Sequence, residues 1–227
     1  MAIKTVDASI LETLAGYDSA TAQNAGILVR GYTAEGQDYT GPGLQRMLRE
    51  PESVVVGYAL TSTWTPLNEP STPAADRNGF WDSIGEANAP VIAVLQDIDA
   101  PARRGAIIGD GMAYTMHALG AIGAVVEGNA RDVPGISNSG MHLWATGRAP
   151  GHGPFSMMSH GVPVTVAGLE ILPGDILVCD GDGVTRVPVE IAADVAKACA
   201  DVRKKESALH RYFTAPDFSF EKWRAER

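Results

Sequence analysis

Two aspartates and one arginine occupy positions where they could act together on a small anionic substrate. Asp110 lies in a turn between two glycines, and the pair Arg131-Asp132 follows after an interval of twenty residues. Carboxylates are hard oxygen ligands suited to Mg²⁺ or Mn²⁺, and a guanidinium can bind two oxygens of a substrate at once. A metal ion and an arginine could therefore hold a 2-oxo acid and stabilise its enolate.

The segments around these residues predict a strand–helix–strand crossover. Val91 to Leu95 and Ala121 to Val126 have the composition of buried strands, and Met112 to Leu119 between them has helical spacing. This order places both polar turns at strand ends, where ligands bind in α/β sheets. A helix beginning near Gly111 also directs free backbone N–H groups toward a ligand carboxylate.

The residue types alone leave a second interpretation open. An Arg-Asp pair near a glycine turn is also common as a surface ion pair or a turn cap. The order of Asp110 and Arg131-Asp132 on one crossover supports a functional site about as well as it supports that plainer role.

The same segment resembles the RraA-like family. The resemblance rests on Asp-x20-Arg-Asp with a glycine before the first aspartate, on the Gly-x-x-Gly-x-Val-Val-x-Gly run from Gly120 to Gly128, and on the ending Val162 to Pro188. It extends from about Ile10 to Pro188. The family includes 4-hydroxy-4-methyl-2-oxoglutarate and 4-carboxy-4-hydroxy-2-oxoadipate aldolases, which also decarboxylate oxaloacetate, and a non-catalytic regulator of ribonuclease activity. The resemblance implies a metal-dependent aldolase that cleaves a 4-hydroxy-2-oxo diacid to pyruvate and a second oxo acid.

Carried over residue by residue, the resemblance implies a role for each polar group. Asp132 would bind Mg²⁺ or Mn²⁺ directly, Asp110 would hold a metal-bound water, and Arg131 would contact the keto oxygen and the developing enolate. Glu206 of a neighbouring subunit is the candidate for a further metal ligand. The pyruvyl carboxylate would lie at the first turn of the helix, against Gly109, Gly111 and Met112.

One position departs from the family pattern. Many of the aldolases have an acidic residue three places after the aspartate of Arg-Asp, where this chain has Gly135. The turn Val133-Pro134-Gly135 must therefore be built differently, and the substrate beyond its pyruvyl half can differ. A regulator that binds a protein partner such as a ribonuclease, and another enolate-forming lyase or hydrolase, remain alternatives.

The resemblance also implies the fold, a three-layer β/β/α sandwich like the swivelling phosphohistidine domain, assembled as a homotrimer or homohexamer. We expect a single domain over residues 1–227, with a core at about 8–190 and a C-terminal helical arm at 191–227. Ser9 begins a capping-box pattern, a second helix is predicted from Ser19 to Gly26, and a strand from Ser53 to Leu60. Thr65 to Pro73 is predicted as a loop, Asn78 to Asn88 as a helix, and the segment after Val162 as a β-meander.

Composition limits the other function classes. The formal net charge of −9 argues against a nucleic-acid-binding surface, and no apolar run is long enough to span a bilayer. The first residues lack signal-peptide features, so the expected compartment is the cytoplasm. Cys179 and Cys199 are predicted to be reduced and structural.

Other polar residues have a structural and a functional interpretation each. His160 could match a phosphohistidine, but its surroundings favour a loop residue. His142 and His152 flank a glycine-rich stretch that is either a mobile loop or part of the substrate pocket. Asp180 to Gly183 is predicted as a hairpin turn rather than a calcium loop, and the pair Arg103-Arg104 could attract an acidic substrate.

Overall fold

The computed structural model describes residues 3–34, 38–47, 53–70 and 73–226. Its helices are α1 (Ala8–Ala15), α2 (Ser19–Arg30), α3 (Arg77–Gly85), α4 (Asp110–Ala118), α5 (Val133–Asn138), α6 (Ala192–Phe213) and α7 (Phe220–Ala225), with a 3₁₀ turn at Val189–Ile191. Its strands are β1 (Gln45–Arg46), β2 (Val55–Thr65), β3 (Val91–Asp97), β4 (Ala106–Ile108), β5 (Ala121–Ala130), β6 (His142–Arg148), β7 (Ser156–His160), β8 (Val164–Val166), β9 (Leu169–Ile171), β10 (Ile176–Cys179) and β11 (Val184–Val187).

The central sheet has a parallel middle and antiparallel edges. Its strand order is β1-β6-β5-β3-β2-β10-β11, with β4 added beside β5 and β7 beside β2. The pairs among β2, β3, β5 and β6 are parallel, whereas β1, β7, β10 and β11 pair antiparallel. The predicted crossover is confirmed in its main elements, because β3 and β5 are parallel neighbours and α4 lies between them along the chain. The strand that leads directly into α4 is β4, a short strand beside β5 that the sequence did not predict.

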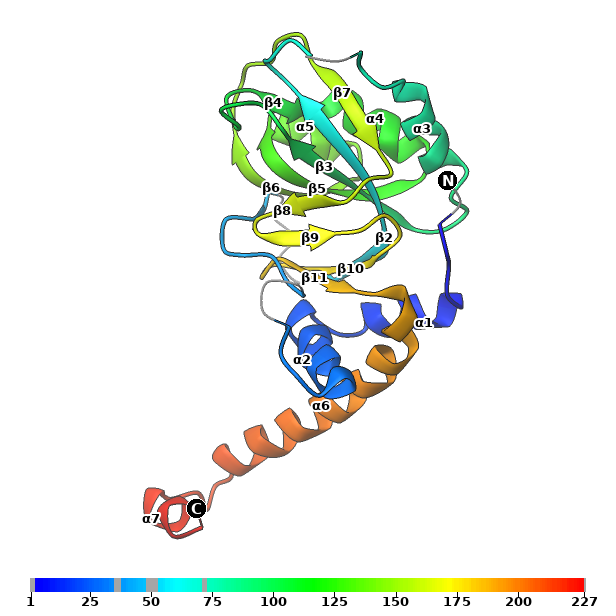
Figure 1. Cartoon of the computed structure of the whole chain (residues 1–227). Coiled ribbons are helices and arrows are strands. Elements are labelled where there is room, and N and C mark those ends of the chain that lie inside the picture. Colours follow the sequence, from blue (N-terminus) through cyan, green and yellow to red (C-terminus); the bar gives the residue numbers. More distant parts are fainter. Residues whose placement is uncertain (1–2, 35–37, 48–52, 71–72, 227) are drawn as a thin grey trace.

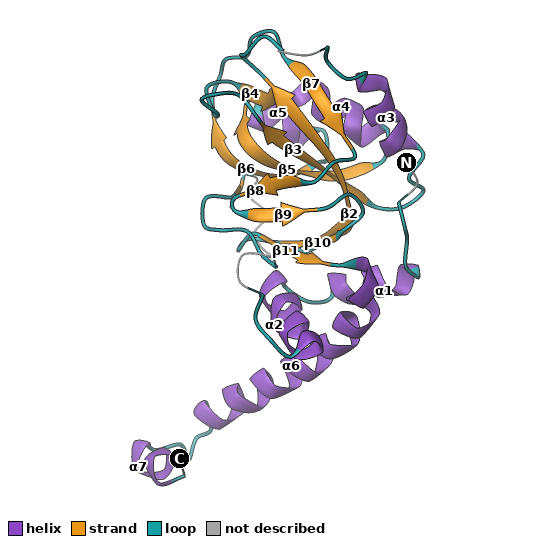
Figure 2. Cartoon of the chain, viewed as in Figure 1, coloured by secondary structure: helices purple, strands orange, loops and turns teal. Residues whose placement is uncertain are grey.

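Both faces of this sheet are covered, which explains why β3 is apolar at every position from Val91 to Leu95. Val91, Ala93 and Leu95 belong to the hydrophobic cluster shared with the helices. Ile92 and Val94 point to the other face and pack with the strands β8 and β9, which form a small separate sheet. Figure 2 shows the resulting layers of helices, large sheet and small sheet. The predicted β/β/α fold class is confirmed.

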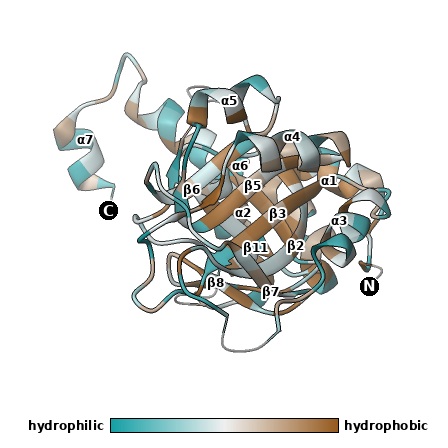
Figure 3. Cartoon of the chain, turned by 90° about the horizontal axis from the view of Figure 1, so that it is seen from above, coloured by the Kyte–Doolittle hydropathy of each residue, from teal (hydrophilic) through white to brown (hydrophobic). Residues whose placement is uncertain are grey.

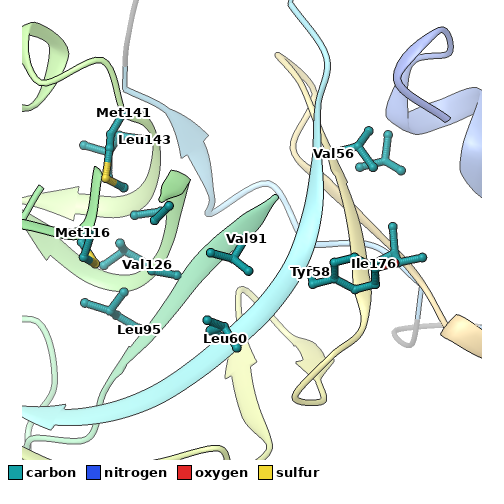
Figure 4. Packing of buried hydrophobic residues seen from close by; sticks show 14 of the residues in the cluster. Val56, Tyr58, Leu60, Val91, Leu95, Met116, Val126, Met141, Leu143 and Ile176 are labelled. Atoms are coloured by element: carbon teal, nitrogen blue, oxygen red, sulfur yellow. The ribbon is translucent and has the colours of Figure 1, made fainter. Parts of the chain in front are cut away.

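The core beneath α4 anchors that helix to the sheet. Figure 4 shows Met116 of α4 beside Leu95 of β3 and Val126 of β5, and all three side chains are fully buried. Burying a side chain of this size contributes about 1.5–3 kcal/mol. The helix that begins at Asp110 is therefore anchored to the strands it connects.

The C-terminal arm is confirmed as a long helix. The first half of α6 packs on α1 and α2 through Val195, Cys199 and Val202. The second half leads away from the sheet toward α7, as Figure 1 shows. Its exposed side chains include Leu209 and Phe213, and an aromatic cluster joins this end of α6 to α7.

The boundaries of the first two helices differ from the prediction. The cap of α1 is Asp7, which accepts a hydrogen bond from the Ser9 backbone N–H at 2.9 Å, so the predicted capping box at Ser9 is wrong by two residues. Helix α2 continues through Gly26 and ends at Gly31, which has a left-handed backbone with φ of 79°. A glycine can end a helix in this conformation without steric cost, whereas Gly26 lies buried within α2.

The tertiary structure corrects or completes three further predictions. Strand β2 extends past Leu60 to Thr65, because its polar second half pairs with β7. The predicted β-meander is two separate hairpins, since β8–β9 form their own sheet and β10–β11 join the large one. The predicted loop from Thr65 to Pro73 begins after β2, and residues 71–72 lie outside the described residues.

Both cysteines are free and buried. Burial raises the pKa of the Cys199 thiol to about 11 and raises the pKa of the Cys179 thiol as well, so neither is a ready nucleophile. Among the residues that the structure describes, no helix is both long and apolar enough to cross a membrane.

Candidate active site

The two polar turns lie side by side because their strands are paired. Ile108 at the end of β4 is the register partner of Ala130 at the end of β5. The chain continues from Ile108 through Gly109 into α4, and from Ala130 through Arg131 and Asp132 into α5. The Arg131 backbone N–H donates to the Ile108 carbonyl at 3.0 Å. The structure therefore brings Asp110, Arg131 and Asp132 to adjacent strand ends, as the crossover predicted.

Arg131 and Asp132 form an ion pair across Gly109. The Arg131 Nε lies 3.2 Å from Asp132 Oδ2, and the two side chains are 35% and 48% exposed. A pair this exposed contributes little to stability. A Cβ on Gly109 would lie 3.2 Å from both of these atoms, so the absence of a side chain there leaves room for the pair beside the turn.

Asp132 has a left-handed backbone and precedes α5 without capping it through its side chain. Its φ of 52° and ψ of 36° are uncommon for a residue other than glycine, although aspartate tolerates them. It is the N-cap of α5, yet its side chain makes no capping hydrogen bond. Non-glycine residues in this conformation cluster at functional sites. The carboxylate is thus directed toward Arg131 rather than used to stabilise α5.

Asp110 is packed closely against α5. Its Oδ1 accepts a hydrogen bond from the Gly111 backbone N–H at 2.7 Å, so this N–H is occupied, in contrast to its predicted role as a free donor. A Cβ on Gly135 would lie 2.7 Å from Asp110 Cβ and 2.8 Å from its Oδ2. The predicted turn at Val133-Pro134-Gly135 is in fact the start of α5. A side chain at position 135 would therefore displace Asp110.

The helix start borders a cavity of about 190 Å³. The exposed backbone at the start of α4 has no side-chain cap from Gly109, and α4 packs against α5, as Figure 3 shows from above. A second hollow, of about 320 Å³, contains Asp132 and Arg148, and Arg131 borders both spaces. The first cavity is lined by Ala106, Ile107, Ile108, Gly109, Asp110, Gly111, Met112, Arg131, His152 and Phe155.

His152 is a site residue that the sequence left undecided, and Phe155 is one that the sequence analysis missed. The glycine-rich stretch before them begins inside β6, and the following loop reaches the cavity. The Phe155 ring stacks on the buried Trp64 with ring centroids 4.9 Å apart. His142, the other flanking histidine, lies at the start of β6 beside Trp144 and does not line this cavity.

The remaining candidates have structural surroundings. A Cβ on Gly79 would lie 2.9 Å from His160 Nε2, so the ring of His160 packs against α3. Asp180 accepts hydrogen bonds from Ser19 and from the Asp182 backbone N–H, as expected of a turn. Arg103 pairs with Glu127 of β5, and Arg104 binds the Pro101 carbonyl at 2.9 Å, so one arginine ties its loop to β5 and the other braces the loop itself.

Glu206 is not brought to these residues within one chain. Glu206 belongs to α6, and this helix lies at the opposite end of the fold from α4 and α5, as Figure 1 shows. Within the described ranges, no group of three or more histidine, cysteine, aspartate or glutamate side chains could hold a metal ion. Asp110 and Asp132 are two hard oxygen donors in an open, solvent-exposed position. That set fits a Mg²⁺ or Mn²⁺ ion that keeps several waters.

Comparisons with known proteins show which family this chain is similar to. The sequence model of the family described as RraA-like, Aldolase/RraA, matches residues 21–186. A Halalkalibacterium halodurans protein named "Putative 4-hydroxy-4-methyl-2-oxoglutarate aldolase" is 30% identical over 168 residues, which cover 66% of this chain and 78% of that protein. Protein DlpA of Legionella pneumophila is 24% identical over 157 residues, which are 68% of this chain. The match spans only 25% of the length of DlpA.

Two solved structures share the fold over nearly the whole chain. An uncharacterized protein from Pseudomonas syringae pv. tomato has a TM-score of 0.75 and 23% identity, covering 100% of this chain and 98% of its own. Streptomyces coelicolor RraAS2, described as an unusual member of the RNase ES inhibitor RraA protein family, has a TM-score of 0.72 and 24% identity, covering 91% and 98%. At these identities the likeness shows the fold alone.

Proposed function

This chain belongs to the RraA-like (Aldolase/RraA) family, and from that premise we propose that it is a divalent-metal-dependent aldolase. Its substrate would be a 4-hydroxy-2-oxo diacid, cleaved to pyruvate and a second oxo acid, and oxaloacetate would be decarboxylated at the same site. The observation that carries the proposal is the meeting of Asp110, Arg131 and Asp132 at the paired ends of β4 and β5, beside a cavity.

Each of the three side chains would have a role that follows from its charge. Bound Mg²⁺ or Mn²⁺ supplies positive charge that favours enolate formation. Asp132, whose carboxylate has no capping role, would hold the ion, and Asp110 would orient a water beside it. Arg131 would bind the keto oxygen, since its permanent charge stabilises a developing oxyanion. The first turn of α4 would receive the substrate carboxylate.

The experiment that tests this proposal is an assay of pyruvate release with controlled metal content. We expect pyruvate from oxaloacetate and from 4-hydroxy-2-oxo diacids with Mg²⁺ or Mn²⁺, and almost none after metal removal and in excess EDTA. Asp110 and Asp132 are themselves negative, so near an enolate they help only by holding a cation. Restoring Mn²⁺ should restore activity. Full turnover in EDTA would overturn the metal assignment.

A Gly135→Ala variant should lose activity without unfolding. The added Cβ would lie 2.7 Å from Asp110 Cβ, so the Asp110 carboxylate must move, and misplacing a catalytic group by about 1 Å can cost 100-fold. We expect kcat to fall by roughly 10- to 100-fold, measured with oxaloacetate.

The matched control is Gly85→Ala at the end of α3, where the nearest atom would be Leu119 Cδ2 at an ordinary 3.7 Å. Both substitutions place alanine in a helix, where it is favoured over glycine by about 1 kcal/mol. Melting temperatures report the fold of each variant. If Gly135→Ala turns over like the wild type, the present position of Asp110 is not needed.

A second candidate function is the binding of a protein partner without catalysis, as in the ribonuclease regulator of the family. The exposed aromatic side chains at the end of α6 and in α7 favour it, since such side chains are enriched at protein interfaces. Metal-loaded protein that releases no pyruvate from any of these substrates would favour this candidate over the aldolase.

A further inference from the structure

Among the side chains that line the 190 Å³ cavity, His152 is the one histidine, the residue type that most often serves as a general acid or base. The other two ionisable side chains that line this cavity are Asp110 and Arg131. The guanidinium of Arg131 cannot release its proton. The Oδ1 atom of Asp110 accepts the Gly111 N–H, and the proposed function already assigns this carboxylate to a water beside the metal ion. A proton-transfer role in this cavity therefore falls to the imidazole of His152.

The loop that carries His152 is held on both sides. The Ala106 N–H of β4 donates to the Gly151 carbonyl at 2.7 Å, and the Gly153 N–H donates to the Pro66 carbonyl at 3.0 Å. A Cβ on Gly153 would lie 3.0 Å from Leu67 Cδ2 and 3.2 Å from the Pro66 carbonyl oxygen, so the backbones approach closely. Of the two interpretations of this stretch, the structure supports a pocket wall held in place by backbone hydrogen bonds.

The imidazole itself has a defined orientation. Its Nδ1 lies 3.0 Å from the Gly153 carbonyl oxygen. A carbonyl only accepts, so Nδ1 carries the proton in the neutral ring and Nε2 is left with a free lone pair. The ring lies edge-on to Phe155, with centroids 6.2 Å apart. Phe155 has a left-handed backbone with φ of 55°, which is rare for a bulky residue.

We infer that His152 is the general base of the aldol cleavage, an inference that rests on the proposed aldolase function. Nε2 takes the proton of the C4 hydroxyl, and the O–H electron pair forms the C4 carbonyl of the departing oxo acid. The C3–C4 bond breaks, and its electrons form the pyruvate enolate that Arg131 stabilises. The imidazolium then returns the proton to C3 of the enolate, which completes pyruvate and regenerates the neutral ring.

An assay with oxaloacetate distinguishes the role of His152 from the roles of the other site residues. Its decarboxylation forms the same pyruvate enolate, but the electrons come from the C3–C4 bond as CO₂ leaves, and no hydroxyl proton is removed. Arg131 and the aspartates are needed for both reactions. A base for the hydroxyl is needed only for aldol cleavage. The ratio of the two activities therefore reports the base and not the enolate site.

The test is His152→Asn, assayed on both substrates with Mg²⁺ or Mn²⁺. The asparagine amide can keep a donor for the Gly153 carbonyl but lacks the second ring nitrogen. We expect kcat for cleavage of a 4-hydroxy-2-oxo diacid to fall by about 100-fold or more, the scale of general base catalysis. Oxaloacetate decarboxylation should stay within about threefold of wild type, since the scaffold that binds the enolate is retained, and this activity also shows that the variant is folded.

The matched control is His117→Asn. The His117 ring also faces a carbonyl, with Nδ1 3.3 Å from the Ala121 oxygen, but it lies at the far end of α4 and does not line the cavity. It should retain both activities. Equal losses of both activities in His152→Asn, or no loss of either, would show that His152 is not the base. Wild-type protein that releases no pyruvate from either substrate would overturn the proposed function, and this role with it.

Discussion

Replacing Arg131 by lysine should lower kcat for pyruvate release by roughly 100-fold or more, nearly as much as replacing it by alanine. Lysine keeps the charge but loses the planar fork that can bind two oxygens at once. Arg131 borders both spaces of the site, and its Nε already faces Asp132 at 3.2 Å. In that position a planar guanidinium can bind the keto oxygen and the Asp132 carboxylate at the same time. The single ammonium group of lysine cannot reproduce both contacts.

The measurement is kcat and KM with oxaloacetate, because the role assigned to Arg131 is to stabilise charge that develops only in the transition state. Removing such a group lowers kcat more than it raises KM. Arg77→Lys, at the exposed start of α3, is the matched control and should turn over normally. A lysine variant of Arg131 that keeps most of its kcat would show that Arg131 is not the enolate contact.

Mixing two inactive variants, Asp132→Asn and Glu206→Gln, should restore part of the activity that each lacks alone. We expect each variant to lose about 100-fold or more, because each removes a negative metal ligand. Asparagine tolerates the left-handed backbone of residue 132, so this variant keeps its fold. Glu206 belongs to α6, a helix that lies away from α4 and α5 of its own chain (Figure 1), so Glu206 can complete a site only in a neighbouring copy.

The recovery is measured after subunit exchange, which mass measurements confirm. If the site is shared, a mixed interface pairs an intact Asp132 of one copy with an intact Glu206 of the other. The exposed apolar side chains Leu209, Phe213 and Phe220 on this arm are suited to such an association. Each variant mixed with itself is the control. Exchange without recovery would mean that each site is built from one chain or that Glu206 is the wrong residue.

The sequence by itself determined the part of the site that depends on neighbouring elements along the chain. The apolar run at Val91 to Leu95 and the helix after Asp110 predict a crossover, and a crossover requires both turns to lie at adjacent strand ends. The paired ends of β4 and β5 confirm this placement. The motifs around Asp110 and Arg131 also indicated the family, the resemblance to that family implied the β/β/α fold, and the residues after Val189 predicted the long C-terminal helix.

Only the tertiary structure decided which other segments meet these turns. The place of His152 depends on hydrogen bonds from its loop to Ala106 and Pro66, which lie far away in the sequence. The contact between Gly135 and Asp110 depends on how α5 packs against α4. Periodicity and turn residues report the conformation of a segment, because they act through its own backbone. They do not report which distant segment will supply its partners, because hydrogen bonds and packing between segments are set by the assembled fold.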